Sequence, residues 1–151
     1  MTWHVRRRSD PSATERILRS LPSWFGIEEA VTDYVEQAAV LDSFVAEDAA
    51  GDVVGVALVQ RHFPESAELA LIAVHADHRG AGHGRRLVEA GETALRSEGC
   101  RFLEVHTVGP SYEDAGYADT RAFYRALGFA PVHEFTGLDW DGPTLVMMKA
   151  L

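Results

Sequence analysis

Leu69-Ala70-Leu71-Ile72-Ala73-Val74 runs directly into His75-Ala76-Asp77-His78-Arg79-Gly80-Ala81-Gly82-His83-Gly84, and this stretch decides the fold. Its first six residues form a continuous apolar run, which is typical of a central strand covered on both faces. The glycines at alternate positions then indicate a tight turn into a helix, expected over residues 82–98 with Gly99 as its stop signal. A strand that passes through a glycine-rich turn into a helix indicates a mixed α/β (α+β) chain.

Hydrophobic periodicity predicts further elements on both sides of this stretch. Helices are expected over residues 12–21, 27–38 and 118–127, the first opened by a capping box of Ser12 and Glu15. Strands are expected over residues 3–7, 43–47, 53–61, 102–108, 132–135 and 144–149. Because we find no internal repeat and no low-complexity linker, we predict a single domain over residues 1–151.

The composition argues against several classes of partner. The 151 residues hold 14 basic and 23 acidic side chains, a formal charge of −9, and 46% of them are hydrophobic. This balance suits a globular domain, and its negative charge repels DNA and acidic lipid surfaces, so we expect neither DNA nor a membrane as partner. The basic triplet Arg6-Arg7-Arg8 is open to two interpretations, a nucleic-acid patch or a solvated strand edge, and the second is favoured.

Cysteine usage and hydropathy bear on location. Cys100 is the only cysteine, which excludes an internal disulfide and a multi-cysteine zinc site and fits a reducing cytoplasm. No apolar run approaches the ~20 residues of a membrane span, and the first ten residues do not resemble a signal peptide. We therefore expect a cytoplasmic protein.

The glycine loop is suited to a phosphate. Free N–H groups at a helix start carry partial positive charge, and three arginines against one aspartate make residues 75–86 locally basic. The loop lacks both the Gly-Lys-Ser/Thr of a nucleotide P-loop and the glycine spacing of a dinucleotide fingerprint. We expect an anionic ligand of another kind, with an idle strand-to-helix turn as the alternative.

This segment resembles the acetyl-CoA loop of the GCN-five-related N-acetyltransferase (GNAT) superfamily, whose motif fits Arg79, Gly82 and Gly84. A second stretch, Ala122-Phe123-Tyr124-Arg125-Ala126-Leu127-Gly128-Phe129, is similar to the family's Phe/Leu-Tyr-x-x-x-Gly-Phe element. The order of expected elements agrees as well, so the resemblance covers nearly the whole chain. It implies a mixed, mostly antiparallel central sheet with splayed central strands flanked by helices.

The resemblance also implies which residues meet acetyl-CoA. In the family the splayed strand pairs with the pantetheine arm and the loop lies under the pyrophosphate. The cofactor-binding residues implied here are Ile72, Ala73, Val74, Arg79, Gly80, Ala81, Gly82, His83 and Gly84. The family tyrosine that protonates the CoA thiolate corresponds to Tyr124, with a core aromatic as the alternative role. Phe123 and Leu127 are expected to form the buried stripe of this helix, with Tyr124 to its side. The sequence departs from the family at Tyr117, where many members have asparagine, and at Thr120, where alanine is usual.

Acetyl transfer requires a deprotonated amine, and two residues are candidates for the general base. Glu68 stands where the histone-modifying branch has its base glutamate, although a solvated edge residue is an equal alternative. His106, on the neighbouring expected strand, is the rival because histidine titrates near neutrality.

Trp24 and Phe25 are expected at the start of the second helix with Glu28 downstream, a region with which family members often line the acceptor cleft. An aromatic floor with nearby carboxylates favours a cationic amine, and the alternative is a helix cap packed on the core. The acidic loop over residues 109–114 is a candidate for the opposite wall. His75, His78 and His83 lack a carboxylate cluster to complete a metal site, so we expect no metal.

The sequence thus predicts an acetyl-CoA-dependent N-acetyltransferase that acts on a small-molecule amine by direct transfer in a ternary complex. One alternative acceptor is a protein or an aminoacyl-tRNA. Another reading is a non-catalytic acyl-CoA-binding sensor. Because dimers are common in the family, a homodimer is compatible with the resemblance.

Overall fold

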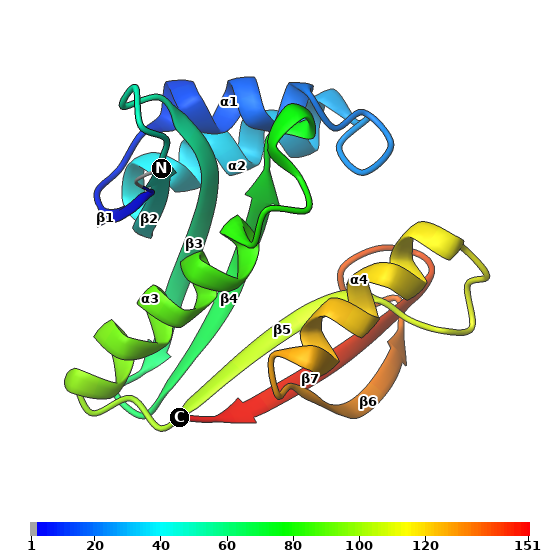
Figure 1. The fold of residues 1–151 in the computed structure, drawn as a ribbon. Helices are drawn as coiled ribbons and strands as arrows, with labels where there is room; N and C mark the ends of the chain where they lie inside the picture. Colours follow the sequence, from blue (N-terminus) through cyan, green and yellow to red (C-terminus); the bar gives the residue numbers. More distant parts are fainter. Residues whose placement is uncertain (1–2) are drawn as a thin grey trace. The chain divides into compact units, whose positions relative to one another are not determined.

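A computed structural model describes residues 3–151, which form seven strands and four α-helices (Figure 1). The strands are β1 (His4–Arg7), β2 (Asp42–Glu47), β3 (Val53–Phe63), β4 (Ser66–Val74), β5 (Phe102–Val108), β6 (Ala130–Thr136) and β7 (Pro143–Ala150). The helices are α1 (Pro11–Arg19), α2 (Glu28–Val40), α3 (His83–Ser97) and α4 (Ala115–Ala126), with a 3₁₀ turn η1 (Ala76–His78) before α3. Hydrogen bonds join the strands in the order β1-β2-β3-β4-β5-β7-β6, so the predicted mixed, mostly antiparallel sheet is confirmed.

The chain folds as two compact units. Unit 1 comprises the chain up to Gln60 together with Ala70–Ser97, and unit 2 comprises Arg61–Leu69 with Glu98–Leu151. The prediction of a single domain over residues 1–151 stays a prediction, and Met1 and Thr2 lie outside the described residues. Within residues 3–151, every helix falls short of the length and apolar character that a membrane crossing requires.

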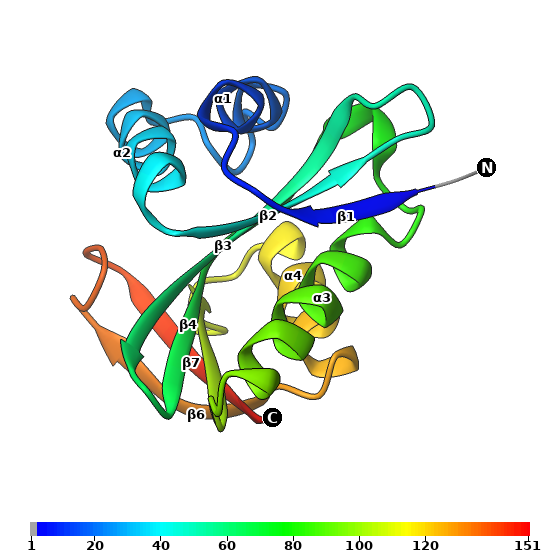
Figure 2. The same cartoon turned by 90° about the vertical axis from the view of Figure 1, so that its left-hand side faces the viewer.

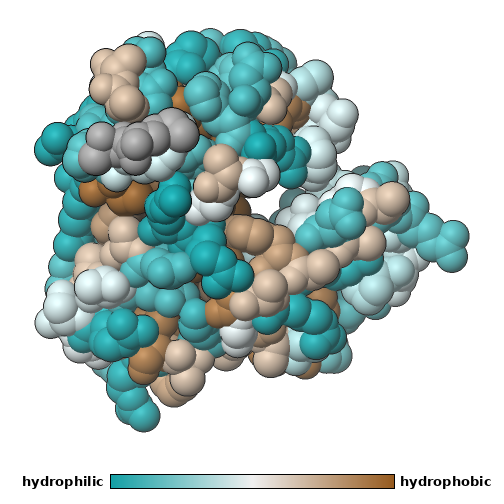
Figure 3. All heavy atoms as spheres, in the orientation of Figure 1, coloured by the Kyte–Doolittle hydropathy of each residue, from teal (hydrophilic) through white to brown (hydrophobic). Residues whose placement is uncertain are grey.

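Unit 1 places strands between helices, with α1 and α2 on one side of β2 and β3 and α3 on the other (Figure 2). The register sets Val45 opposite Val56, and both belong to a buried cluster with Ile17 of α1. On the other face, Gly55 lies against Leu87 of α3, where an added Cβ would come within 2.9 Å of a Leu87 methyl group. Both faces are therefore closely packed. Hydrophilic side chains dominate the visible outer surface of α1 (Figure 3).

The start of α1 differs from the predicted capping box. Asp10 is the N-cap, with its carboxylate accepting a backbone hydrogen bond, and Pro11 is the first helical residue. Ser12 lies inside the first turn, and Glu15 pairs with Arg19 at 2.9 Å instead of capping. The prediction was wrong because an aspartate followed by proline is the stronger start signal.

The strand β4 begins before the apolar run and is not covered equally on both faces. Its side chains alternate, with one set buried and the other half-buried: Ala67, Leu69, Leu71 and Ala73 against Glu68, Ala70, Ile72 and Val74. The expectation of coverage on both faces was therefore wrong. The parallel register with β5 runs from Ser66↔Phe102 to Glu68↔Glu104, and β4 continues beyond it to Val74.

Unit 2 is a sheet of β5, β7 and β6 joined by the start of β4, with α4 in contact with β5 (Figure 1). The register places Val105 opposite Met147, and both are buried, as is Tyr124 of α4. Glu104 and His106 alternate with these buried residues along β5 and are therefore on the other, half-exposed face.

The two outermost strands of the sheet have distinctive side chains. On β1 and just after it, Arg6 and Arg8 bond Glu47 at 2.6 and 2.9 Å, and Arg7 bonds Asp42 at 2.9 Å. This pairing agrees with the interpretation of the basic triplet as a strand edge. On β6, most side chains are exposed, and a register shift between residues 131 and 133 marks a bulge beside Pro131.

Candidate functional site

In unit 1, the loop from η1 to α3 is open and depends on glycine. Gly80 and Gly82 have φ angles of +81° and +85°, in the left-handed region that side chains rarely adopt. A Cβ at either position would meet no atom within 4 Å, so conformation and not packing requires these glycines. The open space beside the loop leaves room for a ligand to reach the backbone.

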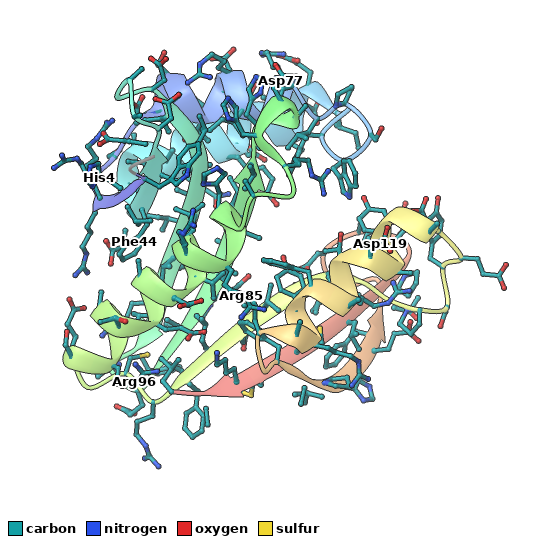
Figure 4. All side chains as sticks on the ribbon, in the orientation of Figure 1. His4, Phe44, Asp77, Arg85, Arg96 and Asp119 are labelled. Carbon is teal, nitrogen blue, oxygen red and sulfur yellow. The ribbon has the colours of Figure 1, made fainter. Side chains whose placement is uncertain are left out.

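Positive side chains surround this loop. Arg85 and Arg86 are exposed in the first turn of α3, and Figure 4 labels Arg85 on that helix and Asp77 in η1. The Arg79 guanidinium lies 4.6 Å from the centre of the Trp24 ring, a cation–π contact that fixes the side chain beside the turn. The locally basic loop expected from the sequence is thus present.

His83, implied as a cofactor residue, turns its side chain inward. The ring is 2% exposed, its centroid lies 4.0 Å from that of Trp3, and neither ring nitrogen has a hydrogen-bond partner among the described residues. Burial, and then the charges of Arg86 and His78, lower the pKa of His83. The neutral side chain is a packing group, and only the backbone of His83 is left to meet a ligand at the start of α3.

The residues expected to line the acceptor cleft have partners within unit 1. Trp24 lies under Arg79, and the Phe25 ring contacts the Tyr34 ring edge to face at 5.8 Å. Both oxygens of Glu28 accept hydrogen bonds from Arg19, at 2.7 and 2.9 Å. A role in acceptor binding for Trp24, Phe25 and Glu28 stays a prediction.

In unit 2, Tyr124 is the buried residue of α4. The sequence suggested a buried stripe of Phe123 and Leu127 with Tyr124 to its side, but Tyr124 is 6% exposed and Phe123 is only half-buried. The Tyr124 ring lies between those of Phe123 and Phe129, at centroid distances of 5.5 and 5.7 Å. Burial, and then the charges of Asp114 and Tyr112, raise the pKa of the nearby helix residue Tyr117.

The two candidate bases belong to a larger group in unit 2, which we name the carboxylate–histidine cluster: His62, Glu68, Glu104, His106 and Asp139. His62 Nε2 lies 2.8 Å from Glu68 Oε1, and His106 contacts Glu104 through Nε2 at 2.9 Å and Asp139 through Nδ1 at 2.8 Å. The parallel register sets Glu68 opposite Glu104, and His106 follows two residues later on the same face of β5.

This geometry favours the protonated form of His106. A neutral imidazole has one N–H, whereas an imidazolium donates from both nitrogens and satisfies both carboxylates. Burial opposes the charged form, but hydrogen bonds to Asp139 and then Glu104 outweigh it and raise the pKa of His106. The protonated form lacks the lone pair that a general base needs.

The same cluster contains the one group among residues 3–151 that brings three metal-type donor atoms within 4.8 Å: those of His62, Glu68 and Glu104. Glu68 already shares a hydrogen bond with His62, and Glu104 shares one with His106. His75, His78 and His83 form no such group. That the protein works without a metal stays a prediction.

Sequence reasoning found Glu68 and His106 but missed their partners. Glu104 and His106 are two residues apart on one expected strand, and this spacing alone predicts that they share a face. The partnership with His62 depends on the β3–β4 turn, and that with Asp139 depends on a loop 33 positions away in the chain, so neither left a local signal.

Comparison with known proteins gives a family match over more than half of the chain. Residues 41–131 match the family model described as "Acetyltransferase (GNAT) domain", a span that includes the glycine loop and the motif around Tyr124. No curated protein matches the chain in sequence.

Solved structures match along the full chain. An acetyltransferase from Thermus thermophilus is 22% identical with a TM-score of 0.74, covering 100% of this chain and 98% of the other. The ribosomal-protein alanine N-acetyltransferase from Escherichia coli is 21% identical with a TM-score of 0.76, covering 99% and 94%. An aminoglycoside 6'-N-acetyltransferase complexed with coenzyme A is 19% identical with a TM-score of 0.74, covering 99% and 97%. At these identities the likeness is one of fold.

Proposed function

Because the chain belongs to the GNAT family of acetyltransferases, we propose that it moves the acetyl group of acetyl-CoA to the primary amine of a small cationic molecule. The observation that carries the choice of acceptor is the carboxylate–histidine cluster, which sets carboxylates on a half-exposed face of unit 2. The proposal includes a cytoplasmic location, where acetyl-CoA is available.

Two features of unit 1 support acetyl-CoA as the donor. The glycine loop presents backbone N–H groups at the start of α3 beside Arg85 and Arg86, which suits the pyrophosphate. From Ala70 to Val74, β4 lies beyond its register with β5, so its backbone is suited to pair with the extended pantetheine arm. In this assignment the loop residues 79–84 hold the phosphates and residues 72–74 hold the pantetheine arm.

We assign the general base to Glu68 and a positioning role to His106. An ammonium group has no lone pair, so its proton must pass to a base before attack. Glu68 receives the His62 contact at Oε1, and we assign its Oε2 to the acceptor amine, directly or through one water. The His106 cation instead holds Glu104 and Asp139 in place.

Transfer then takes place in one ternary complex. The amine nitrogen attacks the thioester carbonyl carbon, the new C–N bond forms, and the C–S bond breaks with its electrons on sulfur. Tyr124 donates its hydroxyl proton to the thiolate and then recovers a proton from solvent, while the attacking nitrogen releases its remaining extra proton to solvent. Backbone N–H groups of β4 stabilise the oxyanion between attack and C–S cleavage. Cys100, the only cysteine, is 3% exposed, which supports direct transfer over an acetyl-cysteine intermediate. Holding amine and thioester together supplies most of the acceleration.

The test is release of CoA thiol from acetyl-CoA with a panel of small primary amines, with and without a chelator. We expect release with cationic amines in both conditions. Tyr124→Phe should lower kcat about 100-fold, the lower range for loss of an acid–base group, while the Kd for CoA is retained. Glu68→Gln should lower kcat/KM by a similar factor.

Three outcomes would contradict the proposal. Tight CoA binding without release for any amine or peptide would identify an acyl-CoA sensor. Release only with peptide N-termini or aminoacyl-tRNA would move the acceptor to a macromolecule. Loss of release with the chelator, restored by a divalent ion, would show that the cluster works with a metal.

A further inference from the structure

Two exposed aromatic rings lie in loops of unit 2, and one of them belongs to Trp140, the residue that follows Asp139 of the carboxylate–histidine cluster. Tyr112 follows β5 and is 45% exposed, and Trp140 lies between β6 and β7 and is 41% exposed. Their ring centroids are 5.5 Å apart in an edge-to-face arrangement. We name this pair the aromatic platform. Two loops distant in the sequence thus place large rings together at the surface, where burial does not explain them.

The aromatic platform is held in position by its own loops. The Trp140 indole N–H donates to the carbonyl of Pro143 at 3.1 Å, and the Gly109 N–H donates to the same carbonyl at 3.0 Å. The Tyr112 N–H donates to the Gly109 carbonyl at 3.1 Å. A Cβ on Gly142 would lie 2.3 Å from the Trp140 ring, so glycine is required for this packing. The rings are therefore arranged before any ligand arrives, which lowers the entropy cost of binding.

Negative charge adjoins the aromatic platform on one side. Asp139 precedes Trp140 in the chain and bonds one nitrogen of His106, while Glu104 bonds the other. The two carboxylates therefore lie on either side of one imidazole, separated by hydrogen bonds of 2.8 and 2.9 Å and the width of the ring. The charge of His106 offsets one of the three carboxylates of the cluster, and the remainder is negative.

Glu134 is a further ionised carboxylate beside this loop, but Ser111 already engages both of its oxygens, so we do not assign it to the ligand. It accepts hydrogen bonds from the Ser111 hydroxyl and N–H, and these bonds, with a smaller effect of Arg121, lower its pKa. Unit 2 nevertheless holds 10 acidic and 5 basic side chains, so its overall charge favours a cation.

We propose that Tyr112, Asp139 and Trp140 bind a second positive charge of the acceptor, which is therefore an aliphatic diamine or polyamine. The inference rests on the proposed function: the reacting amine meets Glu68, and the distal ammonium meets Asp139 and an aromatic face. Trp and Tyr faces attract ammonium groups, and a carboxylate beside them adds directional hydrogen bonds. A monoamine of equal length has one ammonium group, so it can contact either Glu68 or the aromatic platform with Asp139, but not both.

The test compares 1,4-diaminobutane with n-butylamine, which share a carbon chain and differ by one ammonium group. We expect the wild type to favour the diamine in kcat/KM by about tenfold or more, and Trp140→Leu to reduce that preference about tenfold. Trp140→Phe, which keeps an aromatic face, should retain most of it. Phe135→Leu is the matched control, an exposed aromatic on β6 outside the platform, and should leave the preference unchanged.

Calorimetric binding of 1,4-diaminobutane without acetyl-CoA separates this inference from the proposed function. Equal kcat/KM for the two amines, or a preference that survives in Trp140→Leu, would overturn the aromatic platform as a cation site while leaving the enzyme intact. Diamine binding that is lost in Trp140→Leu and restored in Trp140→Phe, but with no acetyl transfer to any amine, would support the site and refute the proposed function.

Discussion

His106 is a histidine whose two ring nitrogens both face carboxylates, and this decides its chemical form. Read from the sequence alone, a histidine on a strand beside a candidate base is an equally good base, because its ordinary pKa is near neutrality. Its partners in the structure stabilise the imidazolium instead. These contacts suit His106 to hold the two neighbouring carboxylates in place.

The charge of His106 predicts a pH-dependent contribution to stability. Its pKa is raised in the folded state because its bonds to Asp139 and Glu104 outweigh the effect of burial. Such a group stabilises the fold fully below the unfolded pKa of about 6.5 and loses that contribution as pH rises through the folded value. We expect the difference in unfolding free energy between wild type and His106→Asn, from urea titrations, to be largest below about pH 6.5 and to shrink at alkaline pH.

The double variant Glu104→Gln/Asp139→Asn provides the comparison for that experiment. With both carboxylates neutralised, substituting His106 should give a smaller and less pH-dependent difference. A difference for the single variant that grows with pH would show that the neutral form of His106 is the one stabilised in the fold.

For single residues, the sequence was enough to identify candidates but not to predict which side chains they contact. Glu68 was identified from its match to the position of the family's base glutamate, and the structure gives it His62 as a neighbour. That contact, and the one between His106 and Asp139, form only when strands and loops come into register. Tyr124 shows the same limit, because its burial follows from the packing of α4 and not from the spacing of Phe123 and Leu127.

Among the elements, the turn from η1 into α3 is the one whose shape depends most on glycine. Its two left-handed glycines border open space, so its shape is set by backbone conformation alone. An alanine at either glycine therefore changes the backbone preference of the turn without creating a steric clash.

We expect Gly82→Ala to raise the KM for acetyl-CoA by about tenfold and to cost about 1 kcal/mol in unfolding free energy, because alanine is strained at φ +85°. Gly51→Ala is a matched control, with φ +88° in the β2–β3 turn and equally open surroundings. It should cost similar stability and leave the KM unchanged. Equal effects of the two variants on KM would mean that the loop does not bind acetyl-CoA.

Elements were predictable where a pattern is long and local. The helix expected over residues 82–98 is α3 (His83–Ser97), because its apolar period and stop glycine lie within the segment itself. The start of α1 was less predictable, since Asp10 and Ser12 are both good capping residues and only one can be used. The half-buried face of β4 also escaped prediction, because Ile72 and Val74 are apolar without being covered.

For the whole molecule, the charge of −9 conceals an uneven distribution. The glycine loop is basic, whereas the cluster face of unit 2 is acidic, and this distribution suits the anionic cosubstrate and the cationic acceptor proposed above. Both attractions act through solvent-exposed charges and are therefore sensitive to salt.

We expect the KM of a cationic acceptor to rise several-fold when salt is raised from about 0.01 M to about 1 M, because the screening length falls from about 30 Å to about 3 Å. Initial rates at saturating acetyl-CoA measure this effect. Sucrose at matched osmolality is the control and should leave the KM unchanged. A salt-independent KM would mean that charge does not select the acceptor.

The two outer strands of the sheet have a consequence for behaviour at high concentration. An exposed strand edge is a template on which further strands can add, leading to fibrils or amorphous aggregates. At β1 the edge carries ion-paired arginines, and at β6 it is broken by a bulge beside Pro131, which has no N–H to donate. Edge-to-edge aggregation is thus disfavoured at both ends, by charge at one and by irregular backbone at the other.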